Sequence, residues 1–138
     1  MDKETLIELK NALSELERLS LALEEFRDCH RLPLKTLMDV NLALDEIFTN
    51  IVSYGFVDHD QHLIKIHLSI EGKALHIRVE DDGVPFNPLE IPEPDLNLPL
   101  EERRTGGLGF YFVRKMMDEL KYERRQGKNI LYLKKKII

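Results

Sequence analysis

The chain has 138 residues, of which 43% are hydrophobic and 33% charged, and its formal net charge is −5. That length gives room for one domain, 1–138, with a core of its own, and no apolar run is long enough to cross a membrane. The acidic balance argues against direct nucleic-acid binding, and a lone cysteine without a signal-peptide pattern favours the cytoplasm.

The beginning of the chain predicts a weak strand and a helix. Residues 5–9 alternate in polarity only weakly and could form a first strand. From about residue 12 to residue 29, apolar residues recur at helical spacing. Ser14 with Glu17 could form a capping box at the start of that helix.

A second helix is predicted over residues 34–54. Pro33 interrupts the first helical pattern and could open this second helix. Leu37, Leu44 and Phe48 share one face, and Gly55 would stop the helix.

A hairpin is expected next, because apolar and polar residues alternate on both sides of Glu71-Gly72. A two-residue turn there would pair Leu68 with Leu75 and Ile66 with Ile77. All apolar side chains of the hairpin then fall on one sheet face. The other face, which we expect to be in water, would carry Lys65, His67, His76, Arg78 and Glu80.

The next segment is rich in proline, since five of the six prolines lie between Pro85 and Pro99. Proline removes a backbone donor and fixes φ, so residues 85–105 should form neither a long helix nor a central strand. Irregular segments of this length in small domains are usually functional or mobile.

The end of the chain predicts a helix and a second hairpin. The helix would cover residues 108–120, with Phe112, Met116 and Leu120 facing inward, and the hairpin would turn near Gly127. Helices and strands in this order predict an α+β fold, a two-layer sandwich in which a mixed, mostly antiparallel sheet packs under three helices.

Glu46 and Asn50 are the first candidates for chemistry. They lie four residues apart in an apolar helical run and therefore share a helix face. The amide oxygen of Asn50 is a suitable ligand for Mg²⁺, and Glu46 could accept a proton or hold a metal-bound water. Taken alone, such a pair is far more often part of a solvated helix face, and Asp45 with Thr49 has the same spacing.

Asp81 and Gly83 directly follow a predicted strand. A carboxylate there can accept a hydrogen bond from an exocyclic amine such as that of adenine, and glycine lets the backbone approach a flat base. An ordinary Asp-Gly turn explains the same residues equally well.

A run of glycines, Gly106-Gly107-Leu108-Gly109, opens the last predicted helix. Its backbone N–H groups and the helix N-terminus together favour a phosphate. Arg103 and Arg104 just upstream could reach a terminal phosphate, or they could be solvated loop charges.

Histidine pairs offer a weaker signal. His59 with His62, or the cross-strand pair His67 and His76, could suggest a metal. Because no cysteine or carboxylate ligands support them in the pattern, surface imidazoles are the better interpretation.

The order of these motifs resembles the GHKL ATPase superfamily with its Bergerat fold. Within it, the chain is most similar to the anti-sigma factor serine kinases, the branch of RsbW and SpoIIAB. Three boxes carry the resemblance: residues 43–50 (ALDEIFTN), 79–88 (VEDDGVPFNP) and 106–118 (GGLGFYFVRKMMD).

The resemblance implies roles for individual residues. Glu46 would be the general base, Asn50 the ligand of Mg²⁺ and Asp81 the reader of adenine. Gly83 would lie against the base, and residues 85–105 would form a lid. The residues near the phosphates of ATP would be Thr105, Gly106, Gly107, Leu108 and Gly109.

The resemblance also implies a function. A homodimer would bind a sigma factor and phosphorylate a serine of a STAS-domain antagonist, with ATP and Mg²⁺ as cofactors. An alternative is a non-catalytic module that sequesters its partner in an ATP-dependent way, although the presence of Glu46 favours the kinase. An orphan ATPase lobe serving a histidine phosphotransfer partner has no positive signal.

Overall fold

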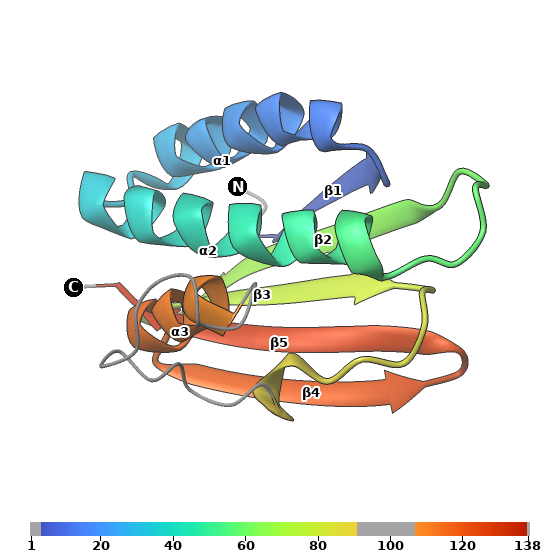
Figure 1. The fold of residues 1–138 in the computed structure, drawn as a ribbon. Helices are drawn as coiled ribbons and strands as arrows, with labels where there is room; N and C mark the ends of the chain where they lie inside the picture. Colours follow the sequence, from blue (N-terminus) through green and yellow to red (C-terminus); the bar gives the residue numbers. More distant parts are fainter. Residues whose placement is uncertain (1–3, 91–106, 138) are drawn as a thin grey trace.

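The computed structural model describes residues 4–90 and 107–137. Its order of elements starts with a strand and two helices, continues with a hairpin, and ends with a helix and a second hairpin (Figure 1). The bounds are β1 Glu4–Lys10, η1 Leu13–Glu15, α1 Leu16–His30, α2 Leu34–Tyr54, β2 Leu63–Glu71, β3 Ala74–Asp81, η2 Pro88–Glu90, α3 Gly107–Met116, β4 Glu119–Arg125 and β5 Lys128–Lys136.

The strands form one sheet in the order β1-β2-β3-β5-β4, and α1, α2 and α3 lie over one of its faces (Figure 1). Each pairing between these five strands is antiparallel. The predicted two-layer α+β sandwich is therefore confirmed, whereas the expectation of a mixed sheet is wrong for the strands that the structure describes.

The core lies between the sheet and the helices. Alternate residues of the central strands point to the helices, as Ile64, Ile66 and Leu68 of β2 do, each at most 1% exposed. Helix α2 meets them with Leu44 and Phe48, which are equally buried. Burying a side chain of this size contributes about 1.5–3 kcal/mol, so this periodicity determines which face of each element turns inward.

The sheet register of the first hairpin differs from the prediction. Leu68 pairs with Ile77, and Ile66 pairs with Val79, because the turn residues are Gly72 and Lys73 instead of Glu71 and Gly72. Gly72 has a φ of 60°, which glycine adopts without strain. A shift of two residues keeps every side chain on its predicted face. The residues predicted to face the core were therefore correct, whereas the predicted cross-strand partners were wrong.

The start of the first helix also differs. Residues 13–15 form a 3₁₀ turn, and α1 begins at Leu16 without a side-chain cap, so the predicted capping box of Ser14 and Glu17 does not form. The predicted second helix, in contrast, matches α2 residue for residue.

The last helix is shorter than predicted. Helix α3 ends at Met116, and Leu120 belongs to β4. Phe110 and Val113 are buried, whereas Phe112 is 45% exposed. The inward face of α3 is therefore rotated from the predicted one, because the sheet under it decides which apolar residues are covered.

The opposite face of the sheet carries polar side chains, among them Lys65, His67, His76 and Arg78. His67 lies opposite Arg78 rather than His76, so the suggested cross-strand histidine pair does not form. Strands β1 and β4 are the two edges of the sheet. No helix in residues 4–90 and 107–137 is long and apolar enough to cross a membrane.

Candidate functional site

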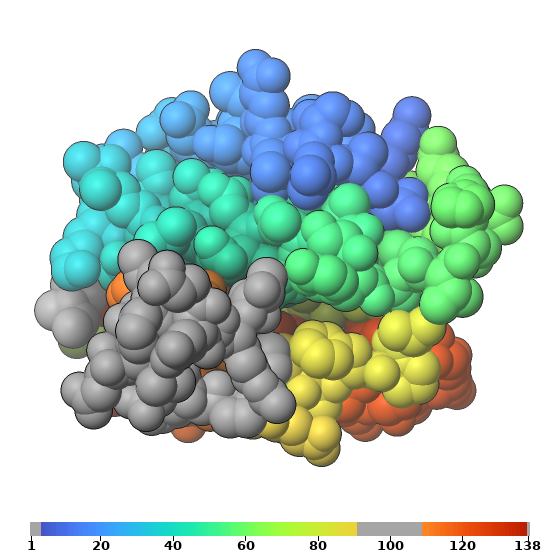
Figure 2. Space-filling model, viewed as in Figure 1, coloured from blue at the N-terminus to red at the C-terminus, as the bar shows by residue number. Residues whose placement is uncertain are grey.

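A cavity of about 140 Å³ lies where the C-terminal end of α2 meets the end of β3. Figure 2 shows these two segments side by side at the surface, the green end of α2 beside the yellow segment after β3. Two of the predicted site residues, Asn50 and Asp81, line the cavity. Its other walls are largely apolar: Ile47, Ile51, Tyr54, Gly55, Val79, Val84, Pro85, Phe86, Pro88, Phe110, Tyr122, Asn129 and Leu131.

The size and lining of the cavity suit one flat ring system. Sites for complete drug-sized ligands measure roughly 300–1,000 Å³, so a cavity of about 140 Å³ suits one ring system better than a complete ligand of that size. The apolar walls would cover the two faces of a ring, while Asp81 and Asn50 offer polar atoms. The geometry therefore fits a heterocyclic base with an exocyclic donor.

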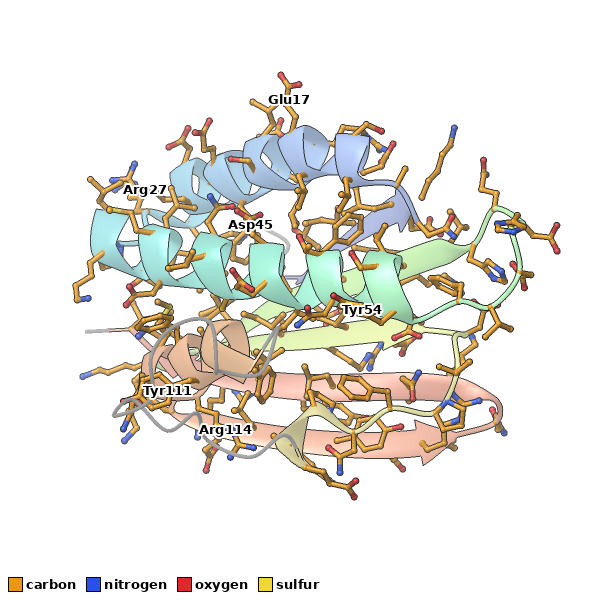
Figure 3. All side chains as sticks on the ribbon, in the orientation of Figure 1. Glu17, Arg27, Asp45, Tyr54, Tyr111 and Arg114 are labelled. Atoms are coloured by element: carbon orange, nitrogen blue, oxygen red, sulfur yellow. The ribbon has the colours of Figure 1, made fainter. Side chains whose placement is uncertain are left out.

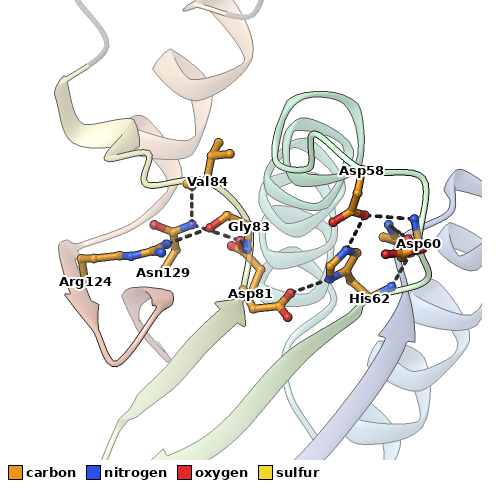
Figure 4. A network of polar contacts seen from close by, with 10 residues as sticks. Asp58, Asp60, His62, Asp81, Gly83, Val84, Arg124 and Asn129 are labelled. Atoms are coloured by element: carbon orange, nitrogen blue, oxygen red, sulfur yellow. Dashed lines mark hydrogen bonds and ion pairs between the residues drawn. The ribbon is translucent and has the colours of Figure 1, made fainter.

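Asp81 is 7% exposed and is held by two hydrogen bonds (Figure 4). The backbone N–H of Gly83 donates to Oδ1 at 2.9 Å, and the side chain of Asn129 donates to the same oxygen at 3.0 Å. Burial raises the pKa of Asp81, while the hydrogen bonds from Asn129 and Gly83 act in the opposite direction. Because both donors engage Oδ1, the second oxygen, Oδ2, is available to a ligand's donor.

Asn129 was missed in the sequence, although a signal for it exists. It lies on β5 directly opposite Asp81 and is 7% exposed. The alternation of Asn129, Leu131 and Leu133 places an amide among inward-facing residues of a strand. A buried polar side chain needs partners, and this requirement could have marked the position.

Gly83 packs closely against the residue that follows α2. A Cβ on Gly83 would overlap the carbonyl oxygen of Gly55 and would lie 2.9 Å from Asp81 Oδ1. The backbone N–H of Val84 donates to that same carbonyl at 2.7 Å. The missing side chain is thus required for the packing of the turn after β3 against the end of α2, and Gly83 is not among the residues that line the cavity.

Glu46 is brought beside the glycine-rich segment. A Cβ on Gly109 would overlap Glu46 Oε2 and would lie 2.9 Å from Glu46 Cδ. Helices α2 and α3 pack against each other, so the carboxylate of the first box meets the third box across this contact. Gly107 is the first residue of α3.

The remaining residues predicted near phosphates, Thr105 and Gly106, lie outside the described residues, and so do Arg103, Arg104 and residues 91–105 of the predicted lid. The segment that leads toward them is anchored. Arg114 of α3, which is labelled in Figure 3, donates to the carbonyl oxygen of Leu89 in η2.

His62 forms a second polar centre next to the site (Figure 4). Its Nε2 lies 2.7 Å from Asp58 Oδ1, and its Nδ1 lies 3.0 Å from Asp82 Oδ1. The ring also stacks on Phe56 with the centroids 4.3 Å apart. The hydrogen bond with Asp58, and then the charges of Asp82 and Asp58, raise the pKa of His62. The imidazole therefore links the loop after α2 to the residue that follows Asp81.

This arrangement predicts a pH-dependent contribution of His62 to stability. A histidine whose pKa is raised on folding stabilises the fold fully below its unfolded pKa of about 6.5, and the contribution is lost as the pH rises through the folded pKa. We expect His62→Gln to lower the urea midpoint most below pH 6.5, with the difference from the original protein shrinking toward pH 9. The exposed His59 in the same loop gives a control, His59→Gln, which should show little difference at any pH. A difference for His62→Gln that stays constant with pH would contradict the assignment.

The sequence matches the family of histidine kinase-like ATPase domains over residues 9–135. It is 30% identical over 104 residues to an anti-sigma F factor of Clostridium kluyveri, covering 75% of this chain and 72% of that protein. It is 31% identical over 94 residues to the serine/threonine-protein kinase BtrW of Bordetella bronchiseptica, covering 68% of this chain and 66% of that protein. With the serine-protein kinase RsbW of Bacillus mycoides it shares 31% identity over 100 residues, covering 70% of this chain and 62% of RsbW.

A solved structure has the same fold. The RsbU and RsbW domains of a Mycobacterium tuberculosis protein superpose with a TM-score of 0.70 at 14% identity, covering 99% of this chain and 33% of that one. The predicted fold of the histidine-kinase-like ATPase type is thereby confirmed.

Proposed function

The chain belongs to the family of histidine kinase-like ATPase domains, and from that membership we propose that it is an anti-sigma regulatory protein that phosphorylates a serine of a partner protein with ATP and Mg²⁺. The observation that carries this proposal is the cavity lined by Asp81 and Asn50, together with the carboxylate of Glu46, which extends from α2 to Gly109 near the start of α3. Asn50, which lines the cavity, and Glu46, which contacts α3, are four residues apart on α2.

Asp81 is the group we assign to adenine. Its buried carboxylate can accept the exocyclic amine through Oδ2, and the base would be covered by the apolar walls of the cavity. Guanine carries a carbonyl oxygen in place of that amine, so it would bring an acceptor against an acceptor. The pocket therefore favours ATP over GTP.

Asn50 fits a nucleotide-bound Mg²⁺. The ion prefers oxygen ligands and keeps several waters, and it takes further ligands from phosphates. No cluster of three metal-binding side chains exists in residues 4–90 and 107–137, which suits an ion that arrives with the nucleotide and not one held by the protein alone. Bound there, Mg²⁺ would neutralise charge on the phosphates, with Asn50 supplying a protein oxygen.

Glu46 is the group we assign to the proton of the attacking serine. Its carboxylate lies against Gly109, near the N-terminal end of α3, where backbone N–H groups and the helix dipole favour phosphate. Phosphoryl transfer depends mainly on such positioning and charge stabilisation, with a base that accepts the hydroxyl proton. A module that only binds its partner would not need a carboxylate at this position.

The partners follow from the relatives. The similarity to an anti-sigma F factor and to RsbW supports a sigma factor and an anti-sigma antagonist as partners, and the antagonist would be a STAS-domain protein that carries the serine. A homodimer in the cytoplasm, with residues 85–105 as the lid, completes the proposal.

Asn50→Ala tests the metal assignment. We expect the variant to lose most of the increase in ATP affinity that Mg²⁺ causes, by roughly tenfold, because a contact to a charged group is removed. Calorimetric titration of ATP with and without Mg²⁺ measures it, and Thr49→Ala on the same helix, a residue that does not line the cavity, serves as control. Equal Mg²⁺ dependence in the original protein and Asn50→Ala would place the metal elsewhere, and an absence of ATP binding by the original protein would refute the proposed function.

A further inference from the structure

Asn129 makes four hydrogen bonds that join three parts of the site, and Figure 4 shows the two that its Nδ2 donates. Its Nδ2 donates to Asp81 Oδ1 at 3.0 Å and to the carbonyl oxygen of Val84 at 2.8 Å. Its Oδ1 accepts from the backbone N–H of Phe86 at 3.2 Å and from the hydroxyl of Tyr122. One side chain of β5 therefore contacts the end of β3, the segment after it and strand β4.

These partners fix the orientation of the amide. The carbonyl of Val84 can only accept and the N–H of Phe86 can only donate, so Nδ2 and Oδ1 of Asn129 cannot exchange places. An asparagine amide has two donor hydrogens and two acceptor lone pairs, and all four are engaged. Asn129 consequently has no hydrogen-bonding capacity left for a ligand, although it lines the cavity.

Asn129 can therefore influence a bound base only through Asp81. The carboxylate could rotate about its side-chain torsions, but the donors from Asn129 and Gly83 converge on Oδ1. That convergence holds the carboxylate in one orientation, with Oδ2 as the remaining acceptor. The amide also offsets the cost of burying the negative charge, since it opposes the effect of burial on the pKa of Asp81.

We propose that Asn129 is a positioning residue that determines adenine selectivity by holding Asp81 in the orientation in which Oδ2 meets the exocyclic amine. This inference rests on the proposed function, because it takes Asp81 as the reader of adenine. Its consequence is that removing Asn129 lowers the affinity for a base with the amine more than the affinity for a base without it.

The experiment compares ATP with the triphosphate of purine riboside, which lacks the amine. Titration calorimetry gives the affinity ratio of the two nucleotides for the original protein and for Asn129→Ala. We expect the ratio to fall roughly tenfold in Asn129→Ala, the size of a hydrogen bond to a charged group. Asn87→Ala is the matched control: Asn87 caps the N–H of Leu89 in the same segment without contacting Asp81, so the ratio should not change.

Asn129→Asp adds a second measurement, the pH dependence of the nucleotide affinity ratio, which would not change if Asn129 had a purely structural role. Two carboxylates would then face each other at the position of a 3.0 Å hydrogen bond, and such a pair takes up one proton that both share. The shared proton restores the hydrogen bond and leaves Asp81 Oδ2 as an acceptor. We expect the nucleotide ratio of Asn129→Asp to be low at pH 8 and to recover toward pH 5.5, while that of Asn129→Ala stays low.

The possible results distinguish a failure of the role of Asn129 from a failure of the adenine assignment to Asp81. A folded Asn129→Ala with an unchanged ratio, or an Asn129→Asp ratio that ignores pH, overturns the role of Asn129. If Asn129→Ala does not fold, the pH dependence of the nucleotide affinity ratio in Asn129→Asp tests the role of Asn129 by itself. If the original protein does not prefer ATP, or if Asp81→Asn leaves the preference of ATP over GTP unchanged, the adenine assignment itself has failed.

Discussion

Glu46→Gln is expected to lower phosphoryl transfer to a partner serine by roughly 10²–10⁴-fold, the range over which a positioned general base contributes. Glutamine keeps the length and shape of the side chain beside Gly109 but cannot accept the proton of the attacking hydroxyl. ATP affinity should change little, because the base pocket is lined by Asp81 and Asn50 and not by Glu46. Phosphoryl transfer is measured as label on candidate STAS-domain proteins that are incubated with labelled ATP and Mg²⁺. Calorimetry measures the affinity for ATP.

Asp45→Asn is the matched control for this prediction. It removes the same charge from the neighbouring position of α2. Asp45 does not line the cavity, and the three atoms nearest to a Cβ on Gly109 all belong to Glu46. Burial, followed by the charge of Glu46, raises the pKa of Asp45, so a neutral amide at this position is a mild change. If Glu46→Gln still transfers the phosphoryl group and Asp45→Asn does not, then Asp45 and not Glu46 is the general base. Tight ATP binding without transfer to any partner would favour the non-catalytic module.

Gly83→Ala is expected to cost about 3 kcal/mol of the free energy of unfolding, at the upper end of ordinary overpacking. The new methyl group would overlap the carbonyl oxygen of Gly55 and would lie 3.0 Å from its carbonyl carbon. Both atoms belong to the backbone, and the hydrogen bond from Val84 to the same carbonyl holds them in place. A flexible side chain could move aside, but here the end of α2 or the end of β3 must shift.

Gly72→Ala separates this steric effect from loss of glycine's conformational freedom. Gly72 has a φ of 60° and open space around its Cα, so alanine there costs only the strain of a left-handed conformation, about 1 kcal/mol. Urea denaturation should therefore rank Gly83→Ala well below Gly72→Ala in stability. We also expect Gly83→Ala to weaken ATP binding, because Asp81 Oδ1 lies 2.9 Å from the position of the methyl group. If the two variants lose the same free energy of unfolding, the backbone around Gly55 can move aside at little cost.

The sequence predicted those parts of the fold that depend on local periodicity. Helix α2 appeared with its observed ends because an apolar stripe runs through it between Pro33 and Gly55. The inward faces of β2 and β3 were also correct, since alternation marks a face regardless of register. The register itself was wrong, because Gly72 can take the first or the second place of a two-residue turn and periodicity does not distinguish them.

Contacts between distant segments were less accessible. Glu46 and Gly109 are 63 positions apart in the sequence. From the sequence, only the resemblance to a family suggested that they belong to one site, and the structure shows them in contact where α2 packs against α3. Asn129 had no motif to mark it, because its role arises from lying opposite Asp81 across a strand pair. The predicted site residues Asn50 and Asp81 do share one cavity, whereas the roles of the site residues remain predictions.

One of the two edge strands of the sheet, β4, affects how the molecule behaves in concentrated solution. Strand β4 (ELKYERR) ends the sheet next to β5, and five of its seven residues are charged. An edge strand with so many charged side chains resists pairing with the same strand of another molecule, because pairing would remove water from these charged groups. Growth of fibres by pairing between β4 edges is thereby disfavoured.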